Sequence, residues 1–177
     1  MKLALKHAFS SGWFCVGMIL AVLPARSQST WELDTKNSFR GAVFGDSISS
    51  YHTMRLVEDD GNNKYYERTD EDLSLGSAQV KRIVYGFYKG QLFSVNVKTI
   101  GLVNSRAVLK ILQSLYGDGE QSNPYIEDYD WLGNKVDLNY KENSITGDAS
   151  IWYNSVPIQK QVDADQARET KNGSSKF

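Results

Sequence analysis

Two neighbouring segments with strand-like patterns of apolar and polar residues, Val80–Tyr88 and Gln91–Ile100, predict a β-hairpin. Only Lys89-Gly90 separates them. A two-residue loop that ends in glycine favours a tight hairpin turn, because glycine adopts positive φ without a clash of a Cβ atom. We therefore expect this hairpin to form the centre of the fold.

The register of the hairpin determines which face is buried. A turn at Lys89-Gly90 would place Val84 opposite Val95 and Gly86 opposite Phe93, so that a large ring covers a residue without a side chain. We predict that the face with Phe93 belongs to the core and that the other face is only half covered.

An amphipathic helix is predicted directly after the hairpin. Asn104 is a candidate N-cap, since its side-chain oxygen can accept a hydrogen bond from the first turn, and Val103 has the spacing of a hydrophobic staple. Gly117 is expected to end the helix. The apolar residues recur at helical spacing, at Val108, Ile111, Leu112, Leu115 and Tyr116. We expect this stripe to pack on the hairpin.

Shorter segments complete the predicted fold. Lys64–Arg68, Lys135–Tyr140 and Ala149–Tyr153 are expected to be further strands. Together they predict one α+β domain over residues 30–157, with an antiparallel sheet of about five or six strands and one main helix packed on one face. Residues 158–177 are mostly polar, so we expect a tail that is partly helical or disordered.

The first 27 residues have the pattern of a secretory signal peptide. Lys2 and Lys6 precede the apolar run Ala8–Leu23, and the small residues Ala25 and Ser27 fit a cleavage site. The run is shorter than the roughly 20 apolar residues that a membrane span needs. We predict that residues 1–27 are removed and that the chain is periplasmic or secreted, without a transmembrane segment after cleavage.

Removal of this leader changes the charge and the cysteine content. The full chain has 20 basic and 21 acidic side chains, and the leader contains three of the basic ones and the single cysteine. The remainder has 17 basic against 21 acidic residues, a net charge of −4. A mildly acidic chain without a basic cluster argues against nucleic acid as a partner, and a chain without cysteine must be stabilised by its core.

Few residues offer catalytic or metal-binding chemistry. His52 is the only histidine after the leader, whereas zinc usually takes about four His, Cys or acidic ligands. Ser47 and Ser49 lie near His52 without a Gly-x-Ser-x-Gly motif around them. The acidic turn Glu58–Asn63 lacks the spacing of a calcium-binding loop, although calcium binding by the acidic turns stays open. We predict no cofactor and no metal site.

Aromatic and acidic residues gather in one stretch after the helix. Tyr125, Tyr129 and Trp131 alternate with acids, and Asp118 and Glu120 lie in the polar loop just before. Exposed aromatic side chains are good binding anchors when a core does not require them. We predict that these five residues form the contact surface of a non-enzymatic binding or adaptor domain, with a protein or glycan partner in the cell envelope.

Two alternative functions depend on other residues. Glu127, Asp128 and Asp130 would serve a carboxylate-based glycan hydrolase if one of them faced a second acid across a pocket. A carrier of a small apolar ligand would use the half-covered sheet face around Tyr85 and Phe87. The first alternative requires a cleft between carboxylates, and the second requires a closed apolar pocket.

Three segments carry a resemblance to known exported proteins. Phe39–Ser47 resembles the Gly-x-x-Phe-Gly-x-Ser/Thr opening of many small exported bacterial domains, and Tyr85–Leu92 and Leu112–Gly117 look like parts of uncharacterised exported proteins of Gram-negative bacteria. The group with a known role that this chain resembles comprises the BamE/SmpA-like outer-membrane assembly lipoproteins and the related fold of β-lactamase inhibitory proteins. Cys15 follows bulky Phe14 within the apolar run, so the chain departs from the lipoprotein pattern.

Overall fold

One large antiparallel sheet dominates the structure, and seven of its strands follow one another in the order β3-β4-β6-β7-β10-β9-β8. The short strand β5 pairs with β6 and completes an eight-stranded sheet. The strands are β3 (Met54–Asp60), β4 (Asn63–Arg68), β5 (Ser74–Leu75), β6 (Ala78–Tyr88), β7 (Gln91–Thr99), β8 (Asp128–Leu132), β9 (Val136–Glu142) and β10 (Ala149–Ser155).

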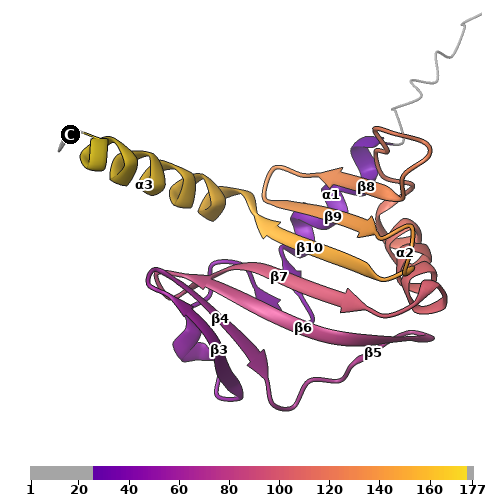
Figure 1. Ribbon diagram of the computed structural model, residues 1–177, viewed down its shortest axis with the longest axis horizontal. Helices are drawn as coiled ribbons and strands as arrows, with labels where there is room; N and C mark the ends of the chain where they lie inside the picture. Colours follow the sequence, from indigo (N-terminus) through magenta and orange to yellow (C-terminus); the bar gives the residue numbers. More distant parts are fainter. Residues whose placement is uncertain (1–25, 175–177) are drawn as a thin grey trace, which may run out of the picture.

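The computed structural model describes residues 26–174, and Figure 1 shows the sheet with helices α1 and α2 behind it. Helix α3 extends away from one end of the sheet. A separate two-stranded ribbon precedes the sheet in the chain. The remaining elements are α1 (Arg26–Lys36), β1 (Ser38–Phe39), β2 (Ala42–Val43), the 3-10 helix η1 (Ile48–Ser50), α2 (Leu102–Tyr116) and α3 (Val156–Ser174).

The predicted sheet of five or six strands with one main helix is wrong, because the sheet has eight strands and the described residues form three α-helices. The largest omission is β3, whose second half is Glu58, Asp59 and Asp60. Acidic residues are rare in strands, so this segment has the composition of a turn. Strand β8 was also missed, because its aromatic and acidic residues predicted a binding segment instead of a strand. Helix α1 was missed because it has no apolar stripe that would indicate a helix.

The turn of the central hairpin is the one predicted, since Lys89 and Gly90 have φ values of 48° and 82°. The predicted register of the two strands is wrong, because the pairing shifts by one residue at a β-bulge between Leu92 and Ser94. Gly86 therefore lies opposite Ser94 instead of Phe93. The pattern of side chains contains no signal for such an inserted residue.

This shift changes the expected burial of part of the hairpin, although Val95 lies in the main core as predicted. The face with Tyr85, Phe87 and Leu92, expected to be half covered, is fully buried in the main core. Phe93 points to the opposite face, where it packs against Ile158 and the rest of a small second cluster. A slip of one residue moves each affected side chain to the other side of a sheet, so the bulge accounts for the difference.

The start of α2 also differs from the prediction. Gly101 occupies the N-cap position, and its backbone N–H donates to the side chain of Asp148 at 2.8 Å. The side-chain oxygen of Asn104 instead accepts a hydrogen bond from the Gln79 amide at 3.0 Å, at the start of β6. Val103 is 83% exposed and forms no hydrophobic staple. The loop before β10, distant in sequence, therefore caps the helix.

Packing of α2 onto the sheet is confirmed. Val108, Leu112 and Tyr116 are buried in the main core, Ile111 is half-buried and Leu115 is exposed. Helix α2 contacts β6 and α1, and α1 contacts β8 and β9, so both helices cover the same face of the sheet. Of the helices in residues 26–174, α3 is the one on the opposite face, where it packs on Tyr88 and Phe93 near the hairpin turn.

The signal peptide predicted over residues 1–27 lies almost entirely outside the described residues, which begin in α1 at Arg26. Within residues 26–174, no helix is both long enough and apolar enough to cross a membrane. The polar segment expected from residue 158 onward begins in α3, whose first turns carry the buried residues Ile158 and Val162. Its later turns are exposed.

Candidate functional site: the open face of the sheet

The residues predicted to form a binding surface lie close together but face different environments. Tyr125 is 93% exposed, whereas Trp131 is only 2% exposed and donates its indole N–H to the Gly117 carbonyl at 2.9 Å. The half-buried Tyr129 ring stacks on Trp131 with a centroid distance of 6.3 Å. Trp131 and Tyr129 therefore stabilise the packing of β8, and Tyr125 is the one freely exposed aromatic of the three.

The two acids of the predicted surface are both exposed and lie in the loop beside β8. Glu120 forms an isolated β-bridge with Asp130, in which both backbone N–H groups donate to the partner carbonyl, at 2.7 and 2.9 Å. Asp118 lies two residues earlier. The loop therefore lies next to the aromatic segment, as predicted, although Trp131 is inaccessible to a partner.

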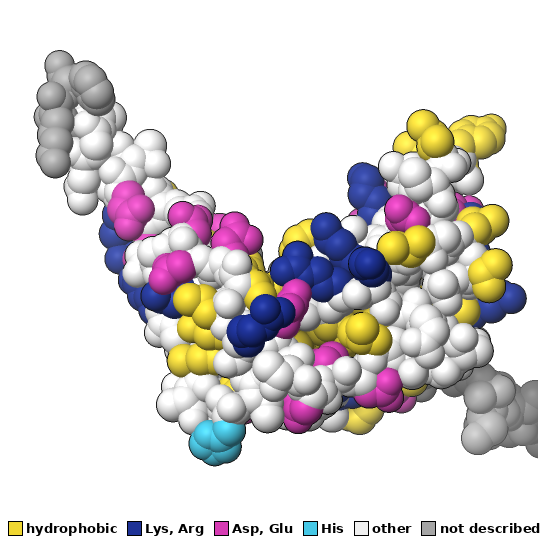
Figure 2. Space-filling model, turned by 60° about the horizontal axis from the view of Figure 1, so that its bottom comes forward, with side chains coloured by type: hydrophobic (Ala, Val, Ile, Leu, Met, Phe, Trp, Pro, Cys, Tyr) yellow, Lys and Arg dark blue, Asp and Glu magenta, His cyan; other side chains and the backbone are white. Residues whose placement is uncertain are grey.

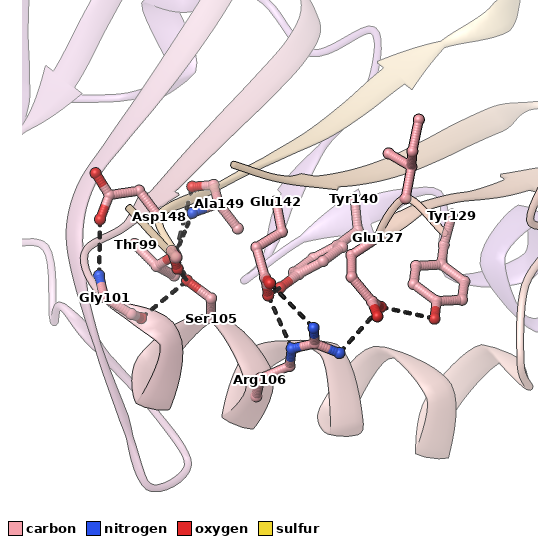
Figure 3. Close-up of polar contacts among 12 residues, drawn as sticks. Thr99, Gly101, Ser105, Arg106, Glu127, Tyr129, Tyr140, Glu142, Asp148 and Ala149 are labelled. Atoms are coloured by element: carbon pink, nitrogen blue, oxygen red, sulfur yellow. Dashed lines mark hydrogen bonds and ion pairs between the residues drawn. The ribbon is translucent and has the colours of Figure 1, made fainter. Parts of the chain in front are cut away.

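A cluster of ion pairs joins α2 to the sheet (Figure 3). The guanidinium of Arg106 lies 2.9 Å from Glu142 Oε2 and 3.0 Å from Glu127 Oε2. Tyr140 and Tyr129 donate their hydroxyls to these two carboxylates, each at 2.8 Å. Burial and the hydrogen bond to Glu142 raise the pKa of Tyr140. Every charge of the cluster is paired, so it serves to hold α2 on β9.

The carboxylates proposed for glycan hydrolysis are also engaged. Glu127 pairs with Arg106, and Asp128 lies 2.7 Å from the Lys141 ammonium. Although burial raises the pKa of Asp128, the hydrogen bonds from Lys141 and Asn139 outweigh it and lower the pKa below its ordinary value. A glycosidase acid needs a raised pKa, so this arrangement does not favour hydrolysis by Asp128.

The sheet face proposed for an apolar ligand is filled by side chains. Tyr85 and Phe87 are in contact with other rings of the core, Phe39, Tyr51 and Tyr66, at centroid distances between 5.3 and 6.2 Å. A cavity of about 90 Å³ lies elsewhere, between α2 and residues such as Phe39 and Tyr153. Ligand pockets are typically about 300 Å³ or larger, so this cavity is too small for a carrier.

The face of the sheet opposite α1 and α2 carries a groove of about 650 Å³. Lys81, Lys98 and Lys141 line it, together with Ser150 and Trp152. The register places Lys98, Ser150 and Lys141 side by side on β7, β10 and β9. Figure 2 shows a hollow between the projecting helix and the other end of the molecule, with Lys and Arg side chains gathered over it.

Trp152 and two of the lysines distinguish this groove. Trp152 is 41% exposed on β10, in contrast to buried Trp131. Lys141 pairs with Asp128, but Lys81 and Lys98 form no ion pair with any residue of the described range 26–174. The two acidic residues of the lining are occupied, since Glu142 binds Arg106 and Asp148 binds the Gly101 amide. The accessible charge is therefore positive.

The sequence did contain a signal for this groove. Ala149, Ile151 and Tyr153 alternate as core residues of the last strand, so Ser150 and Trp152 between them must point to the other face. What the sequence did not indicate was that, among the helices of residues 26–174, only α3 packs on that face, at Tyr88 and Phe93. Lys98 and Lys141 come from strands that are neighbours of β10 in space and distant from each other in the chain.

Comparisons with protein-family models, with curated proteins and with solved structures found no match to this chain. The resemblance to BamE/SmpA-like and β-lactamase-inhibitory proteins therefore stays a prediction. No group of three or more His, Cys, Asp or Glu side chains within the described residues has the arrangement of a metal site.

Proposed function

We propose that this chain is a non-enzymatic binding domain that acts in the periplasm or outside the cell and binds its partner on the open face of the sheet. The observation that carries the proposal is the groove at Trp152, in which a half-exposed indole lies beside Lys81 and Lys98, which pair with no carboxylate of residues 26–174. Tryptophan is enriched among binding hot spots, because it combines a large apolar area with little conformational freedom.

The architecture supports this assignment of the face. Helices α1 and α2 bury the other side of the sheet, and the Arg106 cluster fixes α2 there. Strands held in one sheet give a rigid platform, which reduces the entropy lost on binding. The carboxylates that a hydrolase would use take part in ion pairs or hydrogen bonds, so the chemistry of the site favours binding over catalysis.

Capture of partners from an envelope extract of the source cells tests the proposal. The purified chain, as its host processes it, is immobilised and compared with the variants Trp152→Ala and Tyr125→Ala. We expect Trp152→Ala to reduce the captured material at least tenfold, since hot-spot substitutions cost about 2 kcal/mol or more. Tyr125→Ala should retain it. Equal capture by all three proteins would contradict the assignment of the open face.

A further inference from the structure

We infer that the ligand of this groove is an acidic polypeptide segment in an extended conformation. The inference rests on the proposed function and specifies the chemistry of the partner. Three lysines line the groove, and two of them have no ion-pair partner among residues 26–174. A concave surface with one sign of charge concentrates oppositely charged groups, so the groove selects an anionic partner.

The spacing of the lysines fits an extended chain. Neighbouring strands of a sheet lie about 4.8 Å apart, so Lys98 on β7 and Lys141 on β9, with β10 between them, are attached about 10 Å apart. On β6, Arg82 is the residue opposite Lys98, and Lys81 lies next to it at a bulge, about 14 Å from the position of Lys141 across the sheet. In an extended peptide, every second side chain points the same way at intervals of about 7 Å. Acids at positions i, i+2 and i+4 therefore span the row.

Trp152 would contact the side of the bound peptide that faces away from the lysines. It lies two residues after Ser150 on β10, and hence one repeat of the strand away from the row of lysines. A peptide whose backbone lies between this row and Trp152 would direct alternate side chains to the two sides. The predicted motif is therefore acidic residues that alternate with residues of which at least one is apolar and contacts the indole.

The polar groups of the groove favour a peptide over an anionic glycan. Recognition of a glycan requires many free hydrogen-bonding side chains for its hydroxyl groups. Asn143 accepts hydrogen bonds from the amides of Ile145 and Thr146, and the Thr146 hydroxyl accepts from the Asp148 amide. These loop side chains are thus already engaged, whereas the ammonium groups of Lys81 and Lys98 pair with no carboxylate of residues 26–174.

Fluorescence anisotropy with a synthetic peptide tests the inference. The labelled probe contains Glu-Leu-Glu-Leu-Glu within nine residues, and a matched probe has Gln in place of each Glu. We expect the acidic probe to bind at least tenfold more tightly than the Gln probe, and its affinity to fall as salt screens the charges. Equal affinity of the two probes would overturn the inference.

A pair of variants with the same net charge separates the groove from the charge of the whole protein. Lys81→Gln/Lys98→Gln removes two lysines of the groove, and Lys110→Gln/Lys171→Gln removes two exposed lysines from helices α2 and α3. The first variant should bind the acidic probe about tenfold more weakly, since each partly exposed charge pair contributes about 0.7 kcal/mol, and the second should change the affinity less than twofold. Equal losses in both variants would contradict the inferred site.

A polyuronate oligosaccharide serves as a third probe. If it binds in a manner that depends on Lys81 and Lys98 while the acidic peptide does not bind, the inferred peptide ligand is wrong and the proposed binding face stands. If neither probe binds and capture from the envelope extract is independent of Trp152, the proposed function is wrong as well.

Discussion

Asp34 Oδ1 accepts a hydrogen bond from the backbone amide of Val136 at 3.1 Å, across 102 positions of the chain. The same carboxylate accepts hydrogen bonds from the amides of Asn134 and Lys135, each at 2.7 Å. Helix α1 is thereby attached to the turn between β8 and β9. Gly133 makes the approach possible, because a Cβ atom there would lie 2.4 Å from Asp34 Oδ1.

Substitution Asp34→Ala is expected to destabilise the protein by about 2 kcal/mol, since three amides lose a charged acceptor. Chemical denaturation at pH 7 measures this effect. The neighbouring substitution Glu32→Gln, on the exposed side of α1, serves as the control and should change the free energy of unfolding by less than about 0.5 kcal/mol. Similar effects of both substitutions would contradict the role of Asp34.

The same carboxylate predicts a dependence of stability on pH. Burial raises the pKa of Asp34, but the hydrogen bonds from three amides outweigh it and lower the pKa below its ordinary value. A carboxyl whose folded-state pKa is lowered contributes stability above its unfolded pKa, and this contribution is lost as the pH falls through the folded-state value. The stability difference between wild type and Asp34→Asn should therefore shrink below about pH 4. A difference that stays constant from pH 7 to pH 2.5 would contradict this linkage.

Removal of the Arg106 guanidinium should lower the free energy of unfolding more than removal of the Asp34 carboxylate. The side chain of Glu142 is only 4% exposed, so Arg106→Met leaves a buried carboxylate without its counter-charge and is expected to cost about 3 kcal/mol. The matched control is Arg55→Met, since Arg55 forms a pair with Glu67 at the surface and should lose less than about 1 kcal/mol. Addition of Glu142→Gln to Arg106→Met should restore part of the stability, and failure of this rescue would argue against an unpaired charge as the cause.

A substitution at Gly86 tests the shifted register of the hairpin. A Cβ atom at this position would lie 2.2 Å from Ser94 Oγ and 3.1 Å from the Phe93 ring. Gly86→Ala is therefore expected to lower the free energy of unfolding by about 2 kcal/mol, as is typical of overpacking. Gly173→Ala in α3, where a Cβ atom meets nothing within 4 Å, should be neutral or slightly stabilising because alanine favours helices. A neutral Gly86→Ala would contradict the observed pairing.

Much of the central unit could be predicted from the sequence, because its signals are local. The Lys89-Gly90 turn requires positive φ, and the stripe with Val108 and Leu112 requires an apolar partner. The bulge at Phe93 could not be predicted, since it depends on packing against α3 and Gly86, which are distant in sequence or carry no side chain. The charged strand β3 was missed because it pairs with β4 despite an acidic composition.

The candidate site was harder to predict than the core. Trp131 and Trp152 each lie in a short strand, yet one is buried and the other is half exposed. The difference arises from which face of the sheet receives α1 and α2, and that choice depends on the whole topology. A search for exposed aromatics in the sequence alone therefore indicated the segment around Tyr125 and overlooked the groove.

The bridge between Glu120 and Asp130 has a consequence for self-association. An outer strand with unpaired N–H and C=O groups can recruit a strand from another molecule and start the growth of fibrils. At Asp130 those groups are already satisfied by the chain's own loop, at 2.7 and 2.9 Å. The edge strand β8 is therefore a poor template for polymerisation at Asp130. The domain can expose a large sheet at high concentration without recruiting a strand from another molecule at that position.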